Sequence, residues 1–539
     1  MKNLKKISVL FFTIFLSLFF VACGGSNLDN NNNVNNNGEN NNENGGSNLD
    51  TKYTVTFMVD STIYETRSVS SGEKVAKPND PSKTGHVFEC WLNGEVEWNF
   101  ETDTVTKNLT LTASFLDVSN VVNINNKQDL INLQGQTIDS KFVKINANID
   151  LDEMEWTPIN LKNSTFDGNN YFISNFTISE ANEKAGFFGE IDGSTVKNVV
   201  IEETYIESEV VGEFYAGGLV AYAKNSSLNN CNYAGTVIIT GDKTMYIGGI
   251  AGYVKDCEFN ACVGNASVGS TIYPTETKEV SAYSGGLIGK AENTKIEACS
   301  STGIFSEAYA ECDTTCYAFA GGLVAHFTGT INNSYADCTV SAMTKAFGVG
   351  SVFSHAGGLV GFSESKDSKI SNSYASGVVG SVSDKYAFAG GLISYSDSNI
   401  ENCYASGNTS STSDGNTSCA GGLISYVEND SKISGSFAMG DVHAFLNGTG
   451  FECKAGGLLG NVYIEEGVIF CEIVDCYRSS SQEVIAIKNN SSMGYICEQG
   501  EVKQYFEIWE IIAGKWDNTI WNTYSYQNPT LKIEPSYDL

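Results

Sequence analysis

A Gly-Gly-Leu or Gly-Gly-Ile tripeptide recurs through the middle of this 539-residue chain. Successive copies begin 31 to 37 residues apart, and a degenerate copy, Gly186-Phe-Phe-Gly189, comes before them. The first glycines of the copies are Gly217, Gly248, Gly285, Gly321, Gly357, Gly390, Gly421 and Gly456. A repeat of this period is typical of a solenoid, in which each unit buries its apolar face by stacking on its neighbours.

Each repeat also carries an aliphatic residue, two spacers, a Cys or Ser and often an aromatic residue, as in Ile400-Glu-Asn-Cys-Tyr404. The strands between the turns are too short to be stable alone, so stacking about 4.8 Å apart must pair their backbones. The predicted fold class is all-β: a parallel β-helix, expected to be right-handed, preceded by a small β-grasp-like module. Nine coils would give a length on the order of 40 Å.

These repeats resemble the GLUG motif of bacterial surface proteins. The motif is represented here by Gly357-Gly-Leu-Val-Gly361 and by Ile400 to Gly407, and the resemblance extends from about Gly186 to Tyr477. It implies a protein displayed at a bacterial surface.

The N-terminus has the pattern of an export signal. Lys2, Lys5 and Lys6 precede an apolar run, and residues 1–22 are predicted to be a lipoprotein signal peptide. The sequence Phe-Val-Ala-Cys23 resembles a lipobox, with Phe where Leu is usual, so Cys23 is the predicted lipid attachment site. The alternatives are an ordinary signal peptide or a membrane span, but the run is shorter than the roughly 20 apolar residues of a spanning helix. Residues 23–50 form an Asn-rich tether that is expected to be disordered.

Residues 51–116 are predicted to be a separate β-rich module. Its turn at Ser71-Gly-Glu73, its Pro-rich turn around residue 80, and Phe88 and Trp91 resemble the Listeria-Bacteroides repeat of bacterial envelope proteins. One departure is Asp60-Ser-Thr62, which stands where the family usually has a pair of glycines. The resemblance implies a compact spacer or adhesive unit with Phe88 and Trp91 in its core.

Two flanking segments are expected to cover the ends of the solenoid. Residues 117–180 are predicted to form an N-terminal cap and first coil, with a short helix at 127–133. Residues 181–478 are predicted to form the GLUG-repeat β-helix, and residues 479–539 are predicted to form a C-terminal cap. Trp509, Trp516 and Trp521 in the last segment are expected to seal the final coil; the alternative is a carbohydrate-stacking platform.

Repeat length varies mainly on one side of the Cys/Ser position. The longest connections are Gly264 to Tyr283, Gly303 to Phe319 and Cys338 to His355, and they are predicted to be loops on one side of the solenoid. In repeat proteins such a side is often the binding face, so a protein or glycan ligand is expected there. The alternative is surface loops without a role.

Nine of the fourteen cysteines other than Cys23 fall into two groups. Cys231, Cys262, Cys299, Cys403 and Cys476 share one repeat position with serines and are predicted to be small buried side chains. Cys312 with Cys316, and Cys419 and Cys453 before their glycine pairs, are the predicted disulfide formers. A zinc site at Cys312 and Cys316 is disfavoured, because no second ligand pair accompanies them in the sequence.

Charge and residue usage argue against several functions. The net charge of −31, about −34 without the signal peptide, disfavours nucleic acid as a partner. The residues most suited to catalysis form no triad or paired-carboxylate pattern, so no enzyme, metal site or cofactor is predicted. They are Arg67, Arg478, His86, His326, His355 and His443.

The predicted function is therefore a lipid-anchored adhesin or binding scaffold on the outer face of the cell envelope. It would bind host or matrix macromolecules. The alternatives are a polysaccharide lyase or hydrolase built on a β-helix, and a passive stalk.

Overall fold

The computed structural model describes residues 51–100, 103–180, 183–275, 278–428, 431–448 and 452–462. Beyond these it describes 464–465, 468–469, 471–488, 492–493, 495–497, 501–503, 508, 515–517, 519–522 and 528–532. The predicted signal peptide, Cys23 and the Asn-rich tether lie outside the described residues. The described chain is all-β, with a small N-terminal mixed sheet followed by a parallel β-solenoid of about nine turns. This confirms the predicted fold class; the handedness stays a prediction.

The N-terminal sheet has five strands in the order β2-β1-β5-β3-β4. The strands are β1 (Lys52–Val59), β2 (Thr62–Ser70), β3 (His86–Asn93), β4 (Val96–Glu97) and β5 (Leu109–Asp117). β1 pairs antiparallel with β2 and parallel with β5, as in a β-grasp sheet, although the described part of 51–117 contains no helix. Trp91 is buried and its ring centroid lies 4.9 Å from that of Phe57. Phe88 is only partly buried and packs on Phe115.

The predicted helix after this sheet is present as α2 (Lys127–Ile131). Asn126 caps it, since its side-chain oxygen accepts a hydrogen bond from the Asp129 N–H at 3.1 Å. Leu130 is fully buried in the core cluster of the solenoid, so the helix covers apolar residues of the first coil.

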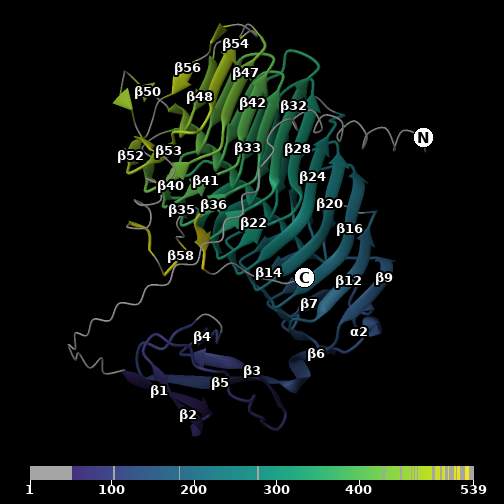
Figure 1. Ribbon diagram of the computed structural model, residues 1–539. Helices are drawn as coiled ribbons and strands as arrows, with labels where there is room; N and C mark the ends of the chain where they lie inside the picture. The colour runs from purple at the N-terminus through teal and green to yellow at the C-terminus, as the bar shows by residue number, and fades with distance from the viewer. Residues whose placement is uncertain are drawn as a thin grey trace, which may run out of the picture. The chain divides into compact units, whose positions relative to one another are not determined.

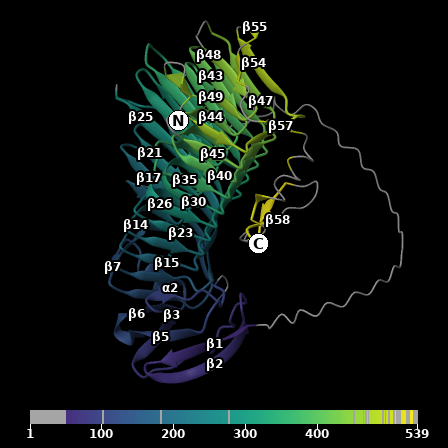
Figure 2. The same cartoon turned by 90° about the vertical axis from the view of Figure 1, so that its left-hand side faces the viewer.

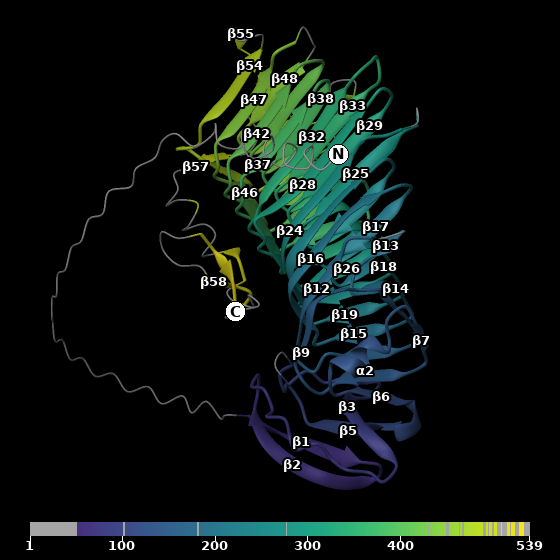
Figure 3. The same cartoon turned by 90° about the vertical axis from the view of Figure 1, so that its right-hand side faces the viewer.

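Each solenoid coil passes through three parallel sheets, here named sheets 1, 2 and 3 (Figures 1–3). Sheet 1 contains β13 (Lys184–Ala185), β17 (Phe214–Gly217), β21 (Met245–Gly248), β25 (Val280–Gly285), β29 (Cys316–Gly321), β33 (Val352–Gly357), β38 (Tyr386–Gly390), β43 (Thr417–Gly421), β48 (Glu452–Gly456) and β56 (Tyr495–Cys497).

Sheet 2 usually receives two strands from each coil. It contains β6 (Val121–Ile124), β7 (Thr137–Asp139), β8 (Phe142–Ile145), β10 (Ile159–Lys162), β11 (Thr165–Asp167), β14 (Phe188–Asp192), β15 (Thr195–Lys197), β18 (Val220–Lys224), β19 (Ser227–Asn229), β22 (Ala251–Lys255), β23 (Glu258–Asn260), β26 (Ile288–Glu297), β30 (Val324–Asn332), β34 (Val360–Ser363), β35 (Lys369–Ser371), β39 (Ile393–Ser396), β40 (Asn399–Glu401), β44 (Ile424–Val427), β45 (Lys432–Ser434), β49 (Leu459–Val462) and β52 (Glu472–Val474).

Sheet 3 completes each coil and is labelled along its length in Figure 1. It contains β9 (Ile149–Glu155), β12 (Phe172–Ile178), β16 (Val200–Val210), β20 (Asn232–Gly241), β24 (Val263–Ile272), β27 (Ser300–Ser301), β28 (Phe305–Cys312), β31 (Tyr335–Ala336), β32 (Thr339–Ala346), β36 (Tyr374–Ala375), β37 (Val379–Ser383), β41 (Tyr404–Ala405), β42 (Thr409–Ser413), β46 (Phe437–Ala438), β47 (Val442–Leu446), β53 (Tyr477–Ser479), β54 (Val484–Lys488), β55 (Ser492–Met493) and β57 (Glu501–Lys503).

The Gly-Gly pair forms the corner between sheets 1 and 2. A Cβ on Gly390 would lie 1.7 Å from the carbonyl oxygen of Ile393, within the same corner. A Cβ on Gly391 would lie 2.0 Å from the carbonyl oxygen of Gly422 in the next coil. Both distances are far shorter than any real contact, so neither position accepts even alanine without movement of the backbone.

The Cys/Ser column begins sheet 3 and is buried, as predicted. Ser334 Oγ accepts a hydrogen bond from the Cys299 N–H at 3.1 Å, and Ser373 Oγ accepts one from the Ser334 N–H at 3.2 Å. A small side chain with a polar γ atom can therefore accept a hydrogen bond from a backbone N–H group of the preceding coil. The residue before each column member has a positive φ, for example Asn230 at 53° and Asn402 at 53°. Asn tolerates this left-handed conformation better than most residues, which explains its frequency there.

The connections predicted to be loops are mostly strands. Within them lie the ends of β24, β28 and β32 in sheet 3 and the starts of β25, β29 and β33 in sheet 1. The turns that remain are 273–279, 313–315 and 347–351, of which 276–277 lie outside the described residues. The prediction of long loops is wrong because the inserted residues alternate small inward and larger outward side chains and extend the existing ladders. We name the row of turns between sheets 3 and 1 the variable edge.

The structure contains one of the predicted disulfides. Cys312 and Cys316 are bonded across a turn of the variable edge. In the described part of the chain, Cys419 and Cys453 form no disulfide, so that prediction is wrong. The physical reason is strand register: Cys453 is opposite Ser418, one residue before Cys419, and side chains one position apart point to opposite faces.

Two of the C-terminal tryptophans cover a flank of the solenoid. Trp516 and Trp521 are buried, and they pack on a stack of rings at the start of sheet 3 in four successive coils. Trp521 belongs to β58 (Trp521–Asn522), labelled in Figure 1, which pairs with β59 (Thr530–Leu531). That stack is Tyr374, Tyr404, Phe437 and Tyr477. The position differs from the expected seal over the final coil, and burial rules out an open stacking platform. Trp509 lies outside the described residues.

Candidate binding surface

The outer faces of sheets 1 and 2 meet at the Gly-Gly corner with a row of aromatic side chains on each side. These positions lie two residues before and five residues after the first glycine in seven of the repeats, and all except Lys290 and Cys419 hold a ring. We name them the aromatic corner. From the first to the last coil the pairs are Tyr215/Tyr222, Tyr246/Tyr253, Tyr283/Lys290, Phe319/His326, His355/Phe362, Phe388/Tyr395 and Cys419/Tyr426.

Strand register stacks the rings of each row. On sheet 1, Tyr246 and Tyr283 have ring centroids 5.0 Å apart, and the next step, from Tyr283 to Phe319, is also 5.0 Å. The two rows also touch each other: the Tyr215 and Tyr222 centroids are 5.8 Å apart and edge-on. Side chains that point outward from two sheets can meet only if the corner is concave on its outer side. Figure 2 shows β17, β21 and β25 of sheet 1 beside the strands of sheet 2.

Ion pairs and polar contacts close the two ends of the aromatic corner. Before the first ring pair, Lys184 Nζ lies 2.5 Å from a carboxylate oxygen of Glu190. After the last, Lys454 Nζ lies 3.1 Å from Glu452 and 3.1 Å from the Asn461 side-chain oxygen. The aromatic surface therefore has defined limits along the solenoid.

Tyr283, His326 and His355 are neutral members of the corner at physiological pH. Desolvation, the largest influence, raises the pKa of Tyr283 to about 12, so its phenol keeps its proton. Burial lowers the pKa of both His326 and His355 to about 3. His355 is stacked between rings of neighbouring coils, with centroids 5.3 Å from Phe319 and 4.9 Å from Phe388. These histidines thus serve as flat, uncharged members of the stack.

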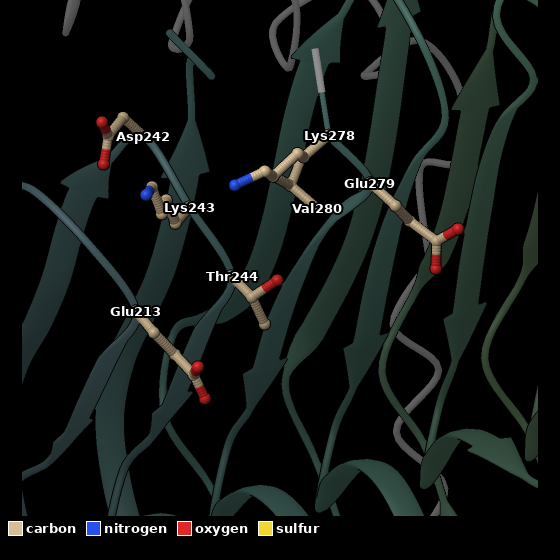
Figure 4. A pocket seen from close by; sticks show the side chains of 7 residues that line it. All are labelled: Glu213, Asp242, Lys243, Thr244, Lys278, Glu279 and Val280. Atoms are coloured by element: carbon tan, nitrogen blue, oxygen red, sulfur yellow. The ribbon is translucent and has the colours of Figure 1, made fainter. Parts of the chain in front are cut away.

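The variable edge holds a small charged depression, shown in Figure 4. Its volume is about 130 Å³, and it is lined by Glu213, Asp242, Lys243, Thr244, Lys278, Glu279 and Val280. Asp242 accepts hydrogen bonds from the Gly212 N–H at 2.8 Å and the Thr275 hydroxyl at 2.9 Å. Its carboxylate therefore mainly ties neighbouring turns together, and the Gly212 bond leads the influences that lower its pKa.

Large apolar side chains are exposed at the tips of the same edge. Phe347 is 62% exposed and Val349 is 97% exposed, both in the turn before β33. Val211 and Tyr273 are exposed in turns of earlier coils. Exposed apolar groups grouped along one edge are typical of an interaction surface.

The residues that the sequence marks as most suited to catalysis remain scattered. His326 and His355 lie in the aromatic corner, whereas His86 belongs to the N-terminal sheet and His443 to sheet 3. Within the described residues, no group of three or more His, Cys, Asp and Glu side chains is placed to hold a metal ion. Nor does any helix among them have the length and apolarity to cross a membrane.

One known family model matches the N-terminal sheet. Residues 53–114 match the Listeria-Bacteroides repeat domain, which agrees with the predicted module at 51–116. No curated protein matches the chain.

Two solved structures show a distant similarity to the solenoid-containing chain. One, from Bacteroides ovatus and described as a candidate immunoglobulin A1 protease, is 16% identical, with 76% of this chain and 92% of that chain covered and a TM-score of 0.26. Another, named IgA1 protease, is 11% identical, with a TM-score of 0.25. The match covers 91% of this chain but only 33% of that protein's chain. TM-scores this low establish neither a shared fold nor a shared activity.

Proposed function

We propose that this protein is exported, lipid-anchored at Cys23 and displayed at the bacterial surface, where it binds a host or matrix macromolecule through the variable edge. Its export signal, lipobox-like sequence and GLUG-like repeats support display. The observation that carries the binding proposal is the exposure of Phe347 and Val349 at the tip of a strand-supported turn.

The structure around these two residues favours recognition. The turn at 347–351 joins β32 to β33, whose ladders hold it at both ends. In the preceding coil the Cys312–Cys316 disulfide fixes the neighbouring turn. A rigid turn loses little conformational entropy on binding, so burial of its apolar groups under a ligand translates into affinity.

Two substitutions at the tip test this binding face. The double variant Phe347→Ser with Val349→Ser should lose most attachment of the full chain to host cells or matrix while its far-ultraviolet β signal is unchanged. Ile304→Ser is the matched control, because Ile304 is also exposed, at 77%, but directly precedes β28, at the opposite end of that strand from the variable edge. Deletion of the whole connection from Cys338 to His355 would remove β32 and most of β33, so a loss of binding could then result from misfolding. Equal attachment by both variants and the parent would favour a passive stalk.

The anchor has its own test. Cys23→Ser should abolish metabolic palmitate labelling and release the protein or leave its precursor unprocessed. Undiminished label in that variant would refute the lipoprotein assignment.

One observation favours the enzymatic alternative. Desolvation raises the pKa of Glu307, on the outer face of β28, to about 7, which suits a general acid. Product release from surface glycans by the parent protein but not by Glu307→Gln would replace the binding proposal with a glycan-degrading enzyme.

A further inference from the structure

The outer face of sheet 3 carries an area without charged side chains across β32, β37 and β42, which are labelled in Figure 3. Alternate residues of these strands point outward, because the residues between them are buried. Charged residues of a protein collect on its surface, so nine neighbouring outward positions without one distinguish this area. We name it the neutral face, and its residues are Thr339, Ser341, Met343, Val378, Gly380, Val382, Asn408, Ser410 and Thr412.

The centre of the neutral face is apolar and open. Val378 is 54% exposed and Val382 is 41% exposed. A Cβ added to Gly380, which lies between them, would have no heavy atom within 4 Å. The centre is therefore a shallow dip between two exposed valines, and grouped apolar side chains of this kind are typical of a surface that another protein covers.

Charge identifies the partner as a second copy of this chain. The net charge of −31 makes most pairs of surfaces on two copies repel each other. On the neutral face that repulsion is weakest, because no outward side chain there is ionised. A two-fold axis brings the same patch of two copies together, so an uncharged patch meets an uncharged patch.

Strand register makes the neutral face complementary to itself about a two-fold axis along β37. In that arrangement each strand before β37 faces the strand that lies equally far after β37 in the second copy. Gly380 then faces Gly380 of the second copy at the axis. Ser341 faces Ser410, where two hydroxyls can share a hydrogen bond, and Met343 faces Thr412.

The complementarity extends one strand further on each side, where β28 faces β47. Tyr309 lies opposite Phe445 of the second copy, so an aromatic ring meets an aromatic ring. Glu307 lies opposite His443, so a carboxyl group meets an imidazole. An axis along the solenoid through the same column would instead set Glu307 against Glu307, and register therefore favours the axis along β37.

The contact also has an adequate area. At the next step β24 faces β54, and Gly269 lies opposite the bulkier Ile485. The strands from β24 to β54 span about 29 Å at a spacing of roughly 4.8 Å, and five residues of each strand span about 17 Å. Two such footprints total about 1,000 Å², which is at the lower end for a specific interface.

We propose that the neutral face joins two copies of this chain into a symmetric dimer, with the two sheets packed face to face about 10 Å apart and the two-fold axis along β37. The small area predicts a weak dimer, with a dissociation constant on the order of 10 μM. Phe347 and Val349 lie outside the neutral face, and the dimer does not depend on the proposed function.

A charge at the axis supplies the first test. Val382→Glu should set two carboxylates against each other and weaken dimerisation of the full chain at least about tenfold, measured by sedimentation equilibrium. Val211→Glu is the matched control, because Val211 is 84% exposed on the variable edge, outside the neutral face. It adds the same charge to the same residue type and should dimerise like the parent.

A pair of complementary charges tests the axis itself. Met343→Lys and Thr412→Glu should each weaken dimerisation about tenfold, because each brings an unpaired charge into the contact. The double variant should regain the affinity of the parent, because each lysine then faces a glutamate of the second copy. Within one copy Val382 separates the two positions, which lie about 9.6 Å apart, so the rescue reports the contact between copies.

Salt separates a second copy from a charged partner. Raising the salt concentration from about 0.05 to 0.5 M should strengthen the dimer, since it screens the repulsion between two acidic chains. All of these substitutions are at outward positions, so the far-ultraviolet β signal should not change. If Val382→Glu alone lost that signal, the charge-pair variants would decide the question.

Four results would overturn the proposal. They are a parent that stays monomeric up to about 100 μM, equal dimerisation of Val382→Glu and the parent, and a double variant that dimerises no better than Met343→Lys or Thr412→Glu alone. The fourth is a monomeric parent that binds an uncharged glucan which Val382→Glu no longer binds. None of these results bears on attachment through Phe347 and Val349, so failure of the dimer is distinguishable from failure of the proposed function.

Discussion

Glu307 makes the stability of the solenoid depend on pH in a way that a single substitution can isolate. Its carboxyl lies on the outer face of β28, and desolvation raises its pKa from the ordinary 4.5 to about 7. An acid whose pKa is higher in the folded than in the unfolded state binds its proton more tightly when folded. Stability is therefore lost as the pH rises from about 4.5 through about 7. The difference between these two pKa values corresponds to a loss of at most about 3 kcal/mol in the free energy of unfolding at higher pH.

Glu307→Gln removes this ionisation and keeps the shape of the side chain. Urea unfolding of the parent and the variant should give equal free energies near pH 4.5 and a more stable variant at pH 8, by up to about 3 kcal/mol. Glu207→Gln is the control, because Glu207 occupies the same outward column of sheet 3 but is exposed. A difference between parent and Glu307→Gln that is constant across this pH range would refute the reasoning, since it would show that packing and not ionisation had changed.

Three further substitutions test the packing. Cys403→Ser should change the melting temperature little, because Ser fills equivalent column positions, whereas Cys403→Trp should lower it sharply; equal tolerance would contradict burial of the column. Gly391→Ala should cost several kcal/mol in urea unfolding because its Cβ meets the backbone of the next coil, and a neutral effect would contradict that geometry. Trp521→Ala should increase hydrogen exchange around Tyr404, whose hydroxyl donates to the Pro529 carbonyl at 2.7 Å, while distant coils keep their protection.

The fold was predictable from the repeat because each recurring residue type occupies a position where local packing excludes most other side chains. Gly390 and Gly391 occupy positions where any Cβ collides with backbone, and Cys403 occupies a buried site that only a small side chain fits. Such demands recur in every coil, so they are visible in one sequence. The short helix around Leu130 was predictable for a related reason, since an Asn cap precedes an apolar pair.

The variable edge and the C-terminal segment were harder to predict because their structure depends on neighbours in space. Residues 305–312 have only Ser, Ala and Cys at their buried positions, which is a weak strand signal, yet they form β28 because β24 and β32 offer backbone partners on both sides. Trp516 and Trp521 pack on rings from several coils, a contact that no spacing within residues 479–539 encodes. Cys419 and Cys453 share a repeat context but differ by one residue in register, which is enough to separate their side chains.

The aromatic corner follows from the glycine pair, although sequence reasoning missed it. Because the two glycines carry no side chain, the nearest large outward groups stand two residues before and five residues after the first glycine, and a concave corner brings them together. The roughly 4.8 Å rise between coils is close to the 5.0 Å spacing of the Tyr246 and Tyr283 rings, so flat side chains stack there without strain. A lysine is accepted at position 290 because its ammonium group lies 5.5 Å from the ring centroid of Tyr253 and 3.0 Å from a carboxylate oxygen of Glu292.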